Sequence, residues 1–282
     1  MVKNKHLENM SNLPLGFTIS ILDQIPWEPH VMGNSIRKVL HNDSSNGTYV
    51  HYRYSSPGGA EKIRQLHLTI NETFYFISGD LPFWEYTCPE DIEGELVTFR
   101  NGFFMDRKPY SIHGRKPYPK SKTGCTLLIW NSGGGEFEAD TSESIQIPFK
   151  GNMPSFDKSF TRPIIIDSEK LEWTDHPNGS NWKWRLLSTE KNNTNLTPRP
   201  VSIIYVPPLW KDTKMKPLNF TESVAWVFVL SGSLAIEVNG KNIDINHGTY
   251  IRWDSNIKII LPLTTSPIGC TLLCVGHDLK RE

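Results

Sequence analysis

Short runs of β-branched and aromatic residues follow one another along most of the chain, separated by clusters of Gly, Pro, Asn and Asp. In the first half these runs lie at residues 48–54, 62–70, 73–79, 95–100 and 125–130. In the second half they lie at residues 200–206, 224–232, 233–240, 248–253, 257–263 and 270–276. No long segment shows the apolar spacing of an amphipathic helix. Many short strands at even spacing are typical of a sandwich or barrel, so the pattern predicts an all-β protein.

The two halves of the chain also share sequence. GCTLL occupies residues 124–128 and recurs 145 residues later, about half the length of the 282-residue chain. Three further segment pairs follow in the same order at similar offsets: 23–40 with 167–187, 76–81 with 229–234, and 101–107 with 247–253. Since one short match can arise by chance but four in one order do not, the sequence indicates a tandem duplication.

The duplication predicts how the chain divides into domains. We expect an N-terminal extension at 1–22, a first barrel at 23–135, a connection at 136–160 and a second barrel at 161–282. The connection is placed there because the region 131–160 lacks hydrophobic periodicity.

Composition narrows the class of partner. Lys plus Arg and Asp plus Glu each number 30, so the formal net charge is zero, which argues against nucleic acid or an anionic membrane. No apolar stretch has the length of a membrane span or of a signal-peptide core. The 4 cysteines form no CxxC pair. We therefore expect a reduced, cytoplasmic protein, and the 11% of aromatic residues suit a pocket for a small molecule.

One spacing pattern carries candidate chemistry. Gln65 and His67 stand two positions apart in QLHLTINETFYFISGD, followed by Glu72, and His113 lies further along in DRKPYSIHG. Residues i and i+2 of a strand point to the same face, so Gln65 and His67 share one. Glu72 opens the next strand of a hairpin and can reach the same point. His113 then arrives from a strand distant in sequence.

Two imidazoles, one carboxylate and one amide oxygen form an octahedral metal set with two open positions. Two histidines and one carboxylate are the ligands expected of non-haem Fe(II), while Zn, Mn, Ni and Cu stay open. Gln65 is a weak neutral donor, so it either ligates loosely or only holds a bound water. Taken singly, each histidine is better explained as an ordinary surface or core residue and the glutamate as a solvated one. Their joint spacing favours a metal site.

These motifs resemble those of the cupin superfamily, and the duplication resembles its two-barrel members, the bicupins. The first cupin motif spaces a glycine, a His-x-His pair, a glutamate and a second glycine at set intervals. The chain keeps every interval, with glutamine in place of the first histidine, at Gly59, Gln65, His67, Glu72 and Gly79. The resemblance implies two tandem jelly-roll barrels, also called double-stranded β-helices, with a divalent metal ion in the first.

Two further segments extend the resemblance. Pro109 and His113 are similar to the second cupin motif, with one residue fewer between them than usual. The opening of the first copy resembles the cupin domains related to the anti-sigma factor ChrR, at Trp27, Pro29, Gly33, Lys38 and Leu40.

The second copy lacks the candidate ligands. Matching on the glycines places Leu218, Phe220, Ala225 and Ile259 opposite the four candidate ligands of the first copy. None of these side chains binds a metal, so we expect a degenerate barrel kept for packing, dimerisation or wall-building. His247 and His277 are then ordinary polar residues.

Candidates for substrate contact follow from the alternation of side chains along strands. Phe74 and Phe76 share a face with the candidate glutamate and would line the barrel. His51 and Arg53 share one face of their strand and, if it points inward, would hold an anionic group. Arg107, beside the second motif, is a similar candidate, although both arginines are equally well surface residues.

Three functions stay open. The first is a metal-dependent enzyme for a small organic substrate with a carboxylate or carbonyl group, catalysing dioxygenation, decarboxylation, isomerisation or lyase chemistry as the resemblance implies. The second is a non-catalytic sensor of zinc or a small molecule, and the third is a metal-free scaffold. The open metal positions and the absence of a nearby cysteine favour the enzyme. Cupin pairs commonly form homodimers, so the resemblance also implies one.

Overall fold

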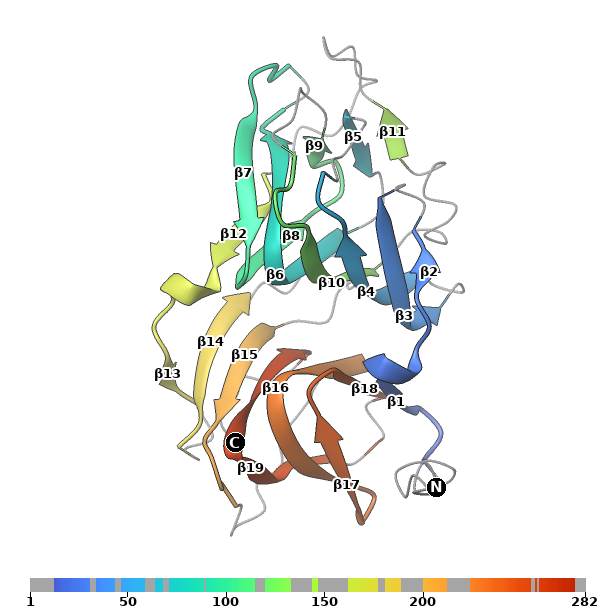
Figure 1. Ribbon diagram of the computed structural model, residues 1–282, viewed down its shortest axis with the longest axis vertical. Coiled ribbons are helices and arrows are strands. Elements are labelled where there is room, and N and C mark those ends of the chain that lie inside the picture. The colour runs from blue at the N-terminus through green and yellow to red at the C-terminus, as the bar shows by residue number, and fades with distance from the viewer. Residues whose placement is uncertain are drawn as a thin grey trace. The chain divides into compact units, whose positions relative to one another are not determined.

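The computed structural model of the chain describes residues 13–30, 34–43, 47–58, 64–67, 71–88, 90–114, 120–132, 144–146, 162–176, 181–188, 200–211, 224–254, 257 and 259–276 (Figure 1). Within these residues it consists of β-strands and two short 3-10 helices, η1 (Leu22–Gln24) and η3 (Ser168–Lys170). Neither helix has the length and apolar character that crossing a membrane requires. The chain divides into two compact units, an N-terminal unit of Ile25–Lys170 and a C-terminal unit of Met1–Gln24 with Leu171–Glu282.

An 11-stranded sheet forms the N-terminal unit. Its strands are β2 (Glu28–Pro29), β3 (Ser35–Asp43), β4 (Thr48–Ser55), β5 (Arg64–His67), β6 (Asn71–Tyr86), β7 (Glu95–Arg100), β8 (Phe103–Arg107), β9 (Ile112–Gly114), β10 (Cys125–Ser132), β11 (Ser144–Gln146) and β12 (Ile164–Asp167). The order is β11-β5-β9-β6-β10-β4-β3-β2, and β6 also pairs with β7 and β8. The long strand β6 is thus the centre of the unit.

An 8-stranded sheet forms the C-terminal unit. Its strands are β1 (Phe17–Ile21), β13 (Thr174–Asp175), β14 (Lys183–Ser188), β15 (Val201–Val206), β16 (Val224–Val238), β17 (Lys241–Asn246), β18 (Thr249–Asp254) and β19 (Ile259–Val275). The order is β1-β18-β16-β19-β15-β14-β13, with β17 on β16. The long strand β16 takes the place here that β6 takes in the N-terminal unit.

β1, which lies in the predicted extension, joins the C-terminal sheet, and β12, which lies in the predicted second barrel, joins the N-terminal sheet. β1 pairs with β18, placing Phe17 opposite Trp253, and β12 pairs with β8, placing Ile164 opposite Asp106. The compact units therefore differ from the predicted extension at 1–22 and from a second barrel that begins at 161. The hydrophobic pattern identifies a strand from its own residues, but it does not say which sheet the strand joins.

Both units contain a glycine at which the central strand approaches a neighbouring strand very closely, and this repeated glycine crossing supports the duplication. Gly79 on β6 and Gly232 on β16 both have a left-handed backbone, with φ of 77° and 75°. A Cβ atom on either would lie 1.9 Å from a carbonyl oxygen, that of Gly124 or of Gly269. Only glycine permits both the positive φ and this close approach of two strands.

An exposed tryptophan under a cation is repeated as well. The Nζ atom of Lys38 lies 4.9 Å from the ring centroid of Trp27, and the guanidinium of Arg185 lies 4.3 Å from that of Trp173. Trp27 and Trp173, which lie in the matched segments 23–40 and 167–187, therefore have equivalent surroundings.

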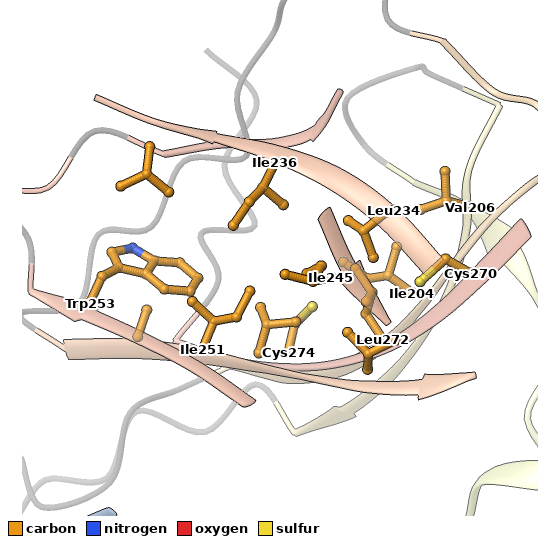
Figure 2. Close-up of a cluster of buried hydrophobic side chains, with 14 of the residues drawn as sticks. Ile204, Val206, Leu234, Ile236, Ile245, Ile251, Trp253, Cys270, Leu272 and Cys274 are labelled. Atoms are coloured by element: carbon orange, nitrogen blue, oxygen red, sulfur yellow. The ribbon is translucent and has the colours of Figure 1, made fainter. Parts of the chain in front are cut away.

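The interiors of the two units differ in chemistry. Figure 2 shows the C-terminal core, where aliphatic, Cys and Trp side chains from β15, β16, β17, β18 and β19 point toward one another. Its labelled members are Ile204, Val206, Leu234, Ile236, Ile245, Ile251, Trp253, Cys270, Leu272 and Cys274. The N-terminal unit has an apolar cluster that includes Phe74, Phe76, Met105 and Leu127. It also buries many polar side chains, and these form the candidate site.

Replacing Gly79 by Ala is expected to lower the free energy of unfolding by at least about 3 kcal/mol, since strain at positive φ adds to a clash with the Gly124 carbonyl. Gly58→Ala is the matched control, because Gly58 has φ of 80° but nothing within 4 Å of an added Cβ. It should cost only about 1 kcal/mol. Urea denaturation measures both values, and equal costs would contradict the importance of the crossing.

Candidate metal site

Three neighbouring strands carry one row of side chains into the candidate site. On β5, β9 and β6, Gln65 is opposite His113, and His113 is opposite Glu85. Residues directly opposite one another in antiparallel strands point to the same side of the sheet. Gln65, His113 and Glu85 therefore form a continuous polar row.

A tight turn explains the short second motif. The turn at residues 108–111 has Pro109 at its second position and Tyr110, with φ of 67°, at its third, an arrangement typical of a type II turn. The Tyr110 amide donates a hydrogen bond to the His67 carbonyl at 2.8 Å. The turn ties this loop to β5 and starts β9 so that His113 lies beside Gln65.

The ligand atoms of His67, Glu72 and His113 converge. One nitrogen from each imidazole and one carboxylate oxygen all lie within 4.8 Å of one another, and all three residues are buried. The His67 Nε2 and Glu72 Oε1 atoms are 4.0 Å apart. Ligands held at about 2.1 Å from one ion lie at most about 4.2 Å apart, so a small closure of the side chains suffices. The described residues thus fit a divalent metal ion.

Gln65 lies beside this group. Its Nε2 atom is 3.5 Å from His113 Nε2. Rotating the amide by half a turn would present its oxygen instead. Metal ligation by Gln65 stays a prediction.

His113 has the tautomer and the neutral charge that a metal ligand requires. Its Nδ1 atom lies 3.3 Å from the Ser111 carbonyl, which only accepts hydrogen bonds, so Nδ1 carries the proton and Nε2 keeps a lone pair. Burial, followed by the charge of Arg107 and then by His67, holds the pKa of His113 well below its usual range. A neutral imidazole binds a metal without first releasing a proton.

Arg107 joins two carboxylates of β6. Its NH1 donates to Glu72 Oε2 and its NH2 to Glu85 Oε1, each at 2.5 Å. The sequence makes Arg107 a candidate for substrate, but the structure commits its guanidinium to these two partners. Glu85 was not identified from the sequence. It lies outside the motif, 13 residues beyond Glu72, and no local pattern brings the two together.

The other substrate candidates lie on the same inner face, further from the candidate metal ligands. Along β6, β10 and β4, Glu72 shares a row with Tyr49, Phe74 with His51, and Phe76 with Arg53. His51 and Arg53 are therefore two and four residues along β4 from the row of Glu72, or about 7 and 13 Å.

These side chains have contacts of their own. Phe74 and Phe76 are 4% and 1% exposed in the apolar cluster, so they fill the barrel and do not line an open pocket. His51 stacks on Tyr49 with ring centroids 4.5 Å apart. Arg53 donates a hydrogen bond to the Ser35 hydroxyl at 3.0 Å.

Two buried histidines face arginines at this end of the barrel. Burial, then Arg37 and Arg53, lowers the pKa of His51 to about 3. Burial, then Arg53, Arg37 and His51, lowers the pKa of His30 to about 2. Both imidazoles are therefore neutral near pH 7.

The second copy shows no equivalent group within the residues that the structure describes. Ala225, matched to Glu72, is 1% exposed in the apolar core, opposite Trp253. His247 is exposed, with Nδ1 2.8 Å from the Leu230 carbonyl. Several residues named in the sequence analysis lie outside the part of the chain that the structure describes. They are the predicted counterparts Leu218 and Phe220, the side chain of Ile259, His277, and Gly59 of the first motif.

Comparison by sequence finds no protein that resembles the chain over most of its length among the matches below. No family model matches the chain. Over 77 residues, 27% of its length, it is 29% identical to the transcription factor STKL2 of Arabidopsis thaliana, of which the match spans 24%. The chain thus matches only about a quarter of that protein, and so short a segment carries no argument about function.

Comparison by structure covers nearly the whole chain. A protein from Nostoc punctiforme, provisionally named a dioxygenase, has a TM-score of 0.63 at 13% identity, over 94% of this chain and 84% of that one. Oxalate decarboxylase from Bacillus subtilis has a TM-score of 0.58 at 10% identity, over 92% and 76%. The protein Ylba from E. coli has a TM-score of 0.53 at 10% identity, over 98% of both chains.

Identities this low establish the fold alone. Since these neighbours are cupin and bicupin proteins, the predicted fold class is confirmed: the chain is all-β and has the fold of two tandem cupin barrels. The particular similarity to ChrR-related domains stays a prediction.

The buried histidines predict a loss of stability in mild acid. An unfolded His51 takes up a proton near pH 6.5, whereas the folded one stays neutral down to about pH 3. Stability present above pH 6.5 is therefore lost as the pH falls, by up to about 1.4 kcal/mol per pH unit for this residue. The free energy of unfolding, measured by urea denaturation at several pH values between 7 and 5, should fall less steeply with pH in His51→Gln than in the wild type. His247→Gln, at an exposed histidine, is the control and should keep the wild-type slope of free energy against pH. An unchanged slope in His51→Gln would contradict the expectation.

Proposed function

We propose that the protein is a metal-dependent enzyme of the cupin type, acting on a small organic substrate that bears a carboxylate or carbonyl group. The observation that carries the proposal is the convergence of the His67, Glu72 and His113 ligand atoms within 4.8 Å in a buried site. His113 is distant in sequence from His67 and Glu72 and reaches them only through the pairing of β9 with β5 and β6, and the donor types of the three residues suit one divalent ion.

The donor set supports more than one metal. Two imidazoles and a carboxylate suit Fe(II), which we favour, and equally Mn(II). Oxalate decarboxylase from Bacillus subtilis, a neighbour in fold, has Mn(II) centres. When bound, the ion would supply Lewis acidity toward a carbonyl or carboxylate, the starting point of dioxygenation, decarboxylation, isomerisation and lyase reactions alike.

The chain's own residues would prepare the site. His113, with its proton on Nδ1, presents Nε2, and Glu72 presents Oε1 on the side of His67. For an anionic group of the substrate we propose Arg53, with neutral His51 as a hydrogen-bonding partner on the same face. A homodimer and a cytoplasmic location stay predictions from the sequence.

Elemental analysis of protein purified without a metal-affinity tag should find about one iron or manganese per chain. His67→Ala and His113→Ala should each lose it, because a set of three strong donors reduced to two no longer holds a divalent ion tightly. His247→Ala, at an exposed histidine of the other unit, is the control and should keep it. A wild type that takes up no metal, even after reconstitution, would favour the metal-free scaffold.

The glutamine at the first ligand position predicts a gain on substitution. Gln65→His replaces a neutral amide by an imidazole next to His113, and should tighten the binding of Mn²⁺ at least about tenfold. Isothermal titration calorimetry measures this change. Equal affinities in the two proteins would mean that the side chain at position 65 is directed away from the ion.

A further inference from the structure

Glu85 is a second carboxylate at the candidate site, and no established motif includes it. It is 2% exposed, and its backbone lies opposite that of His113. Oε1 accepts a hydrogen bond from Arg107, whereas buried Oε2 has no hydrogen-bond partner among the described residues. Burying a carboxylate oxygen without a partner is costly, so its position calls for an explanation.

Direct metal ligation does not supply that explanation. The group of ligand atoms that lie within 4.8 Å of one another contains His67, Glu72 and His113 but not Glu85. The observed contact of Glu85 in the site is Arg107, which in turn holds Glu72. Glu85 therefore acts on the ligand set through the guanidinium.

The charges show what that action is. Two carboxylates, Glu72 and Glu85, share the one guanidinium of Arg107. Burial raises the pKa of Glu85, and the charge and hydrogen bond of Arg107 oppose that shift and favour the ionised carboxylate. All three are buried, so water screens their interactions weakly. If Arg107 faced Glu72 alone, it would neutralise the only carboxylate in the ligand set and repel an incoming cation.

We propose that Glu85 is a positioning residue that neutralises Arg107, so that Glu72 keeps its negative charge for a divalent cation. Arg107 in turn occupies Oε2 of Glu72 and leaves Oε1, the atom nearest His67, for the ion. The inference rests on the proposed metal site and adds to it the outer partners that decide how tightly the ion binds.

The test is the affinity for Mn²⁺, measured by isothermal titration calorimetry on the full chain. Glu85→Gln removes the charge but keeps an acceptor for Arg107, and should weaken binding about 10- to 100-fold. Glu95→Gln is the matched control: Glu95 lies opposite Glu85 in the β6–β7 pair, but its ion pair with Arg162 is exposed. This control should bind like the wild type.

The double variant Glu85→Gln/Arg107→Gln separates charge from structure. It removes both charges of the pair, so it should bind more tightly than Glu85→Gln and within about tenfold of the wild type. A merely structural role predicts the opposite, since two changes disturb packing more than one. Thermal unfolding in the presence of a chelator checks that each variant folds. If Glu85→Gln does not fold, the affinity of the double variant alone still tests the proposal.

Two results would overturn the inference while leaving the metal site in place. The first is a folded Glu85→Gln variant that binds Mn²⁺ as tightly as the wild type. The second is a double variant that binds Mn²⁺ more weakly than Glu85→Gln, or with an affinity more than about tenfold below that of the wild type. A wild type that binds no Mn²⁺ or iron would instead contradict the proposed function itself.

Discussion

The curl of β6 is the constraint on which the candidate site depends. Glu72 and Glu85 belong to this one strand, and 13 residues of straight strand would separate them by about 43 Å. Both nevertheless contact the guanidinium of Arg107. The strand must therefore turn back on itself, and between the two carboxylates lies Gly79, whose left-handed backbone passes directly under the Gly124 carbonyl. Glycine at this position lets one strand supply both ends of the charge network.

The same curl decides the chemistry of the barrel interior. Its first half places Glu72 opposite Arg107, and its second half places Glu85 opposite His113. In the C-terminal unit β16 has an equivalent glycine crossing at Gly232 but carries aliphatic side chains, and its interior is filled with them (Figure 2). One backbone thus serves either a polar centre or an apolar core, depending on which side chains its central strand brings inward.

The short runs and the motif resemblance were enough to predict the fold class. The motif residues His67, Glu72 and His113 lie together in the structure, while metal binding by them stays a prediction. Alternation along a strand places Gln65 and His67 on one face, and a hairpin brings Glu72 within reach, because these relations span only a few residues. Glu85 and the true partners of Arg107 could not be predicted, since they depend on a curved strand and on pairing between distant segments. Neither β1 nor β12 is among the predicted strands, and each pairs with a strand far from it in the sequence, which local patterns do not reveal.

The pairing of β1 with β18 has a consequence for synthesis in the cell. Ile21 and Thr249 stand 228 positions apart in the sequence, so β1 leaves the ribosome long before the strand with which it pairs. Until then the strand has an unsatisfied edge, the kind of surface that pairs with other chains. The C-terminal sheet is therefore complete only after β18 has been synthesised, although β1 is synthesised before the whole of the N-terminal unit.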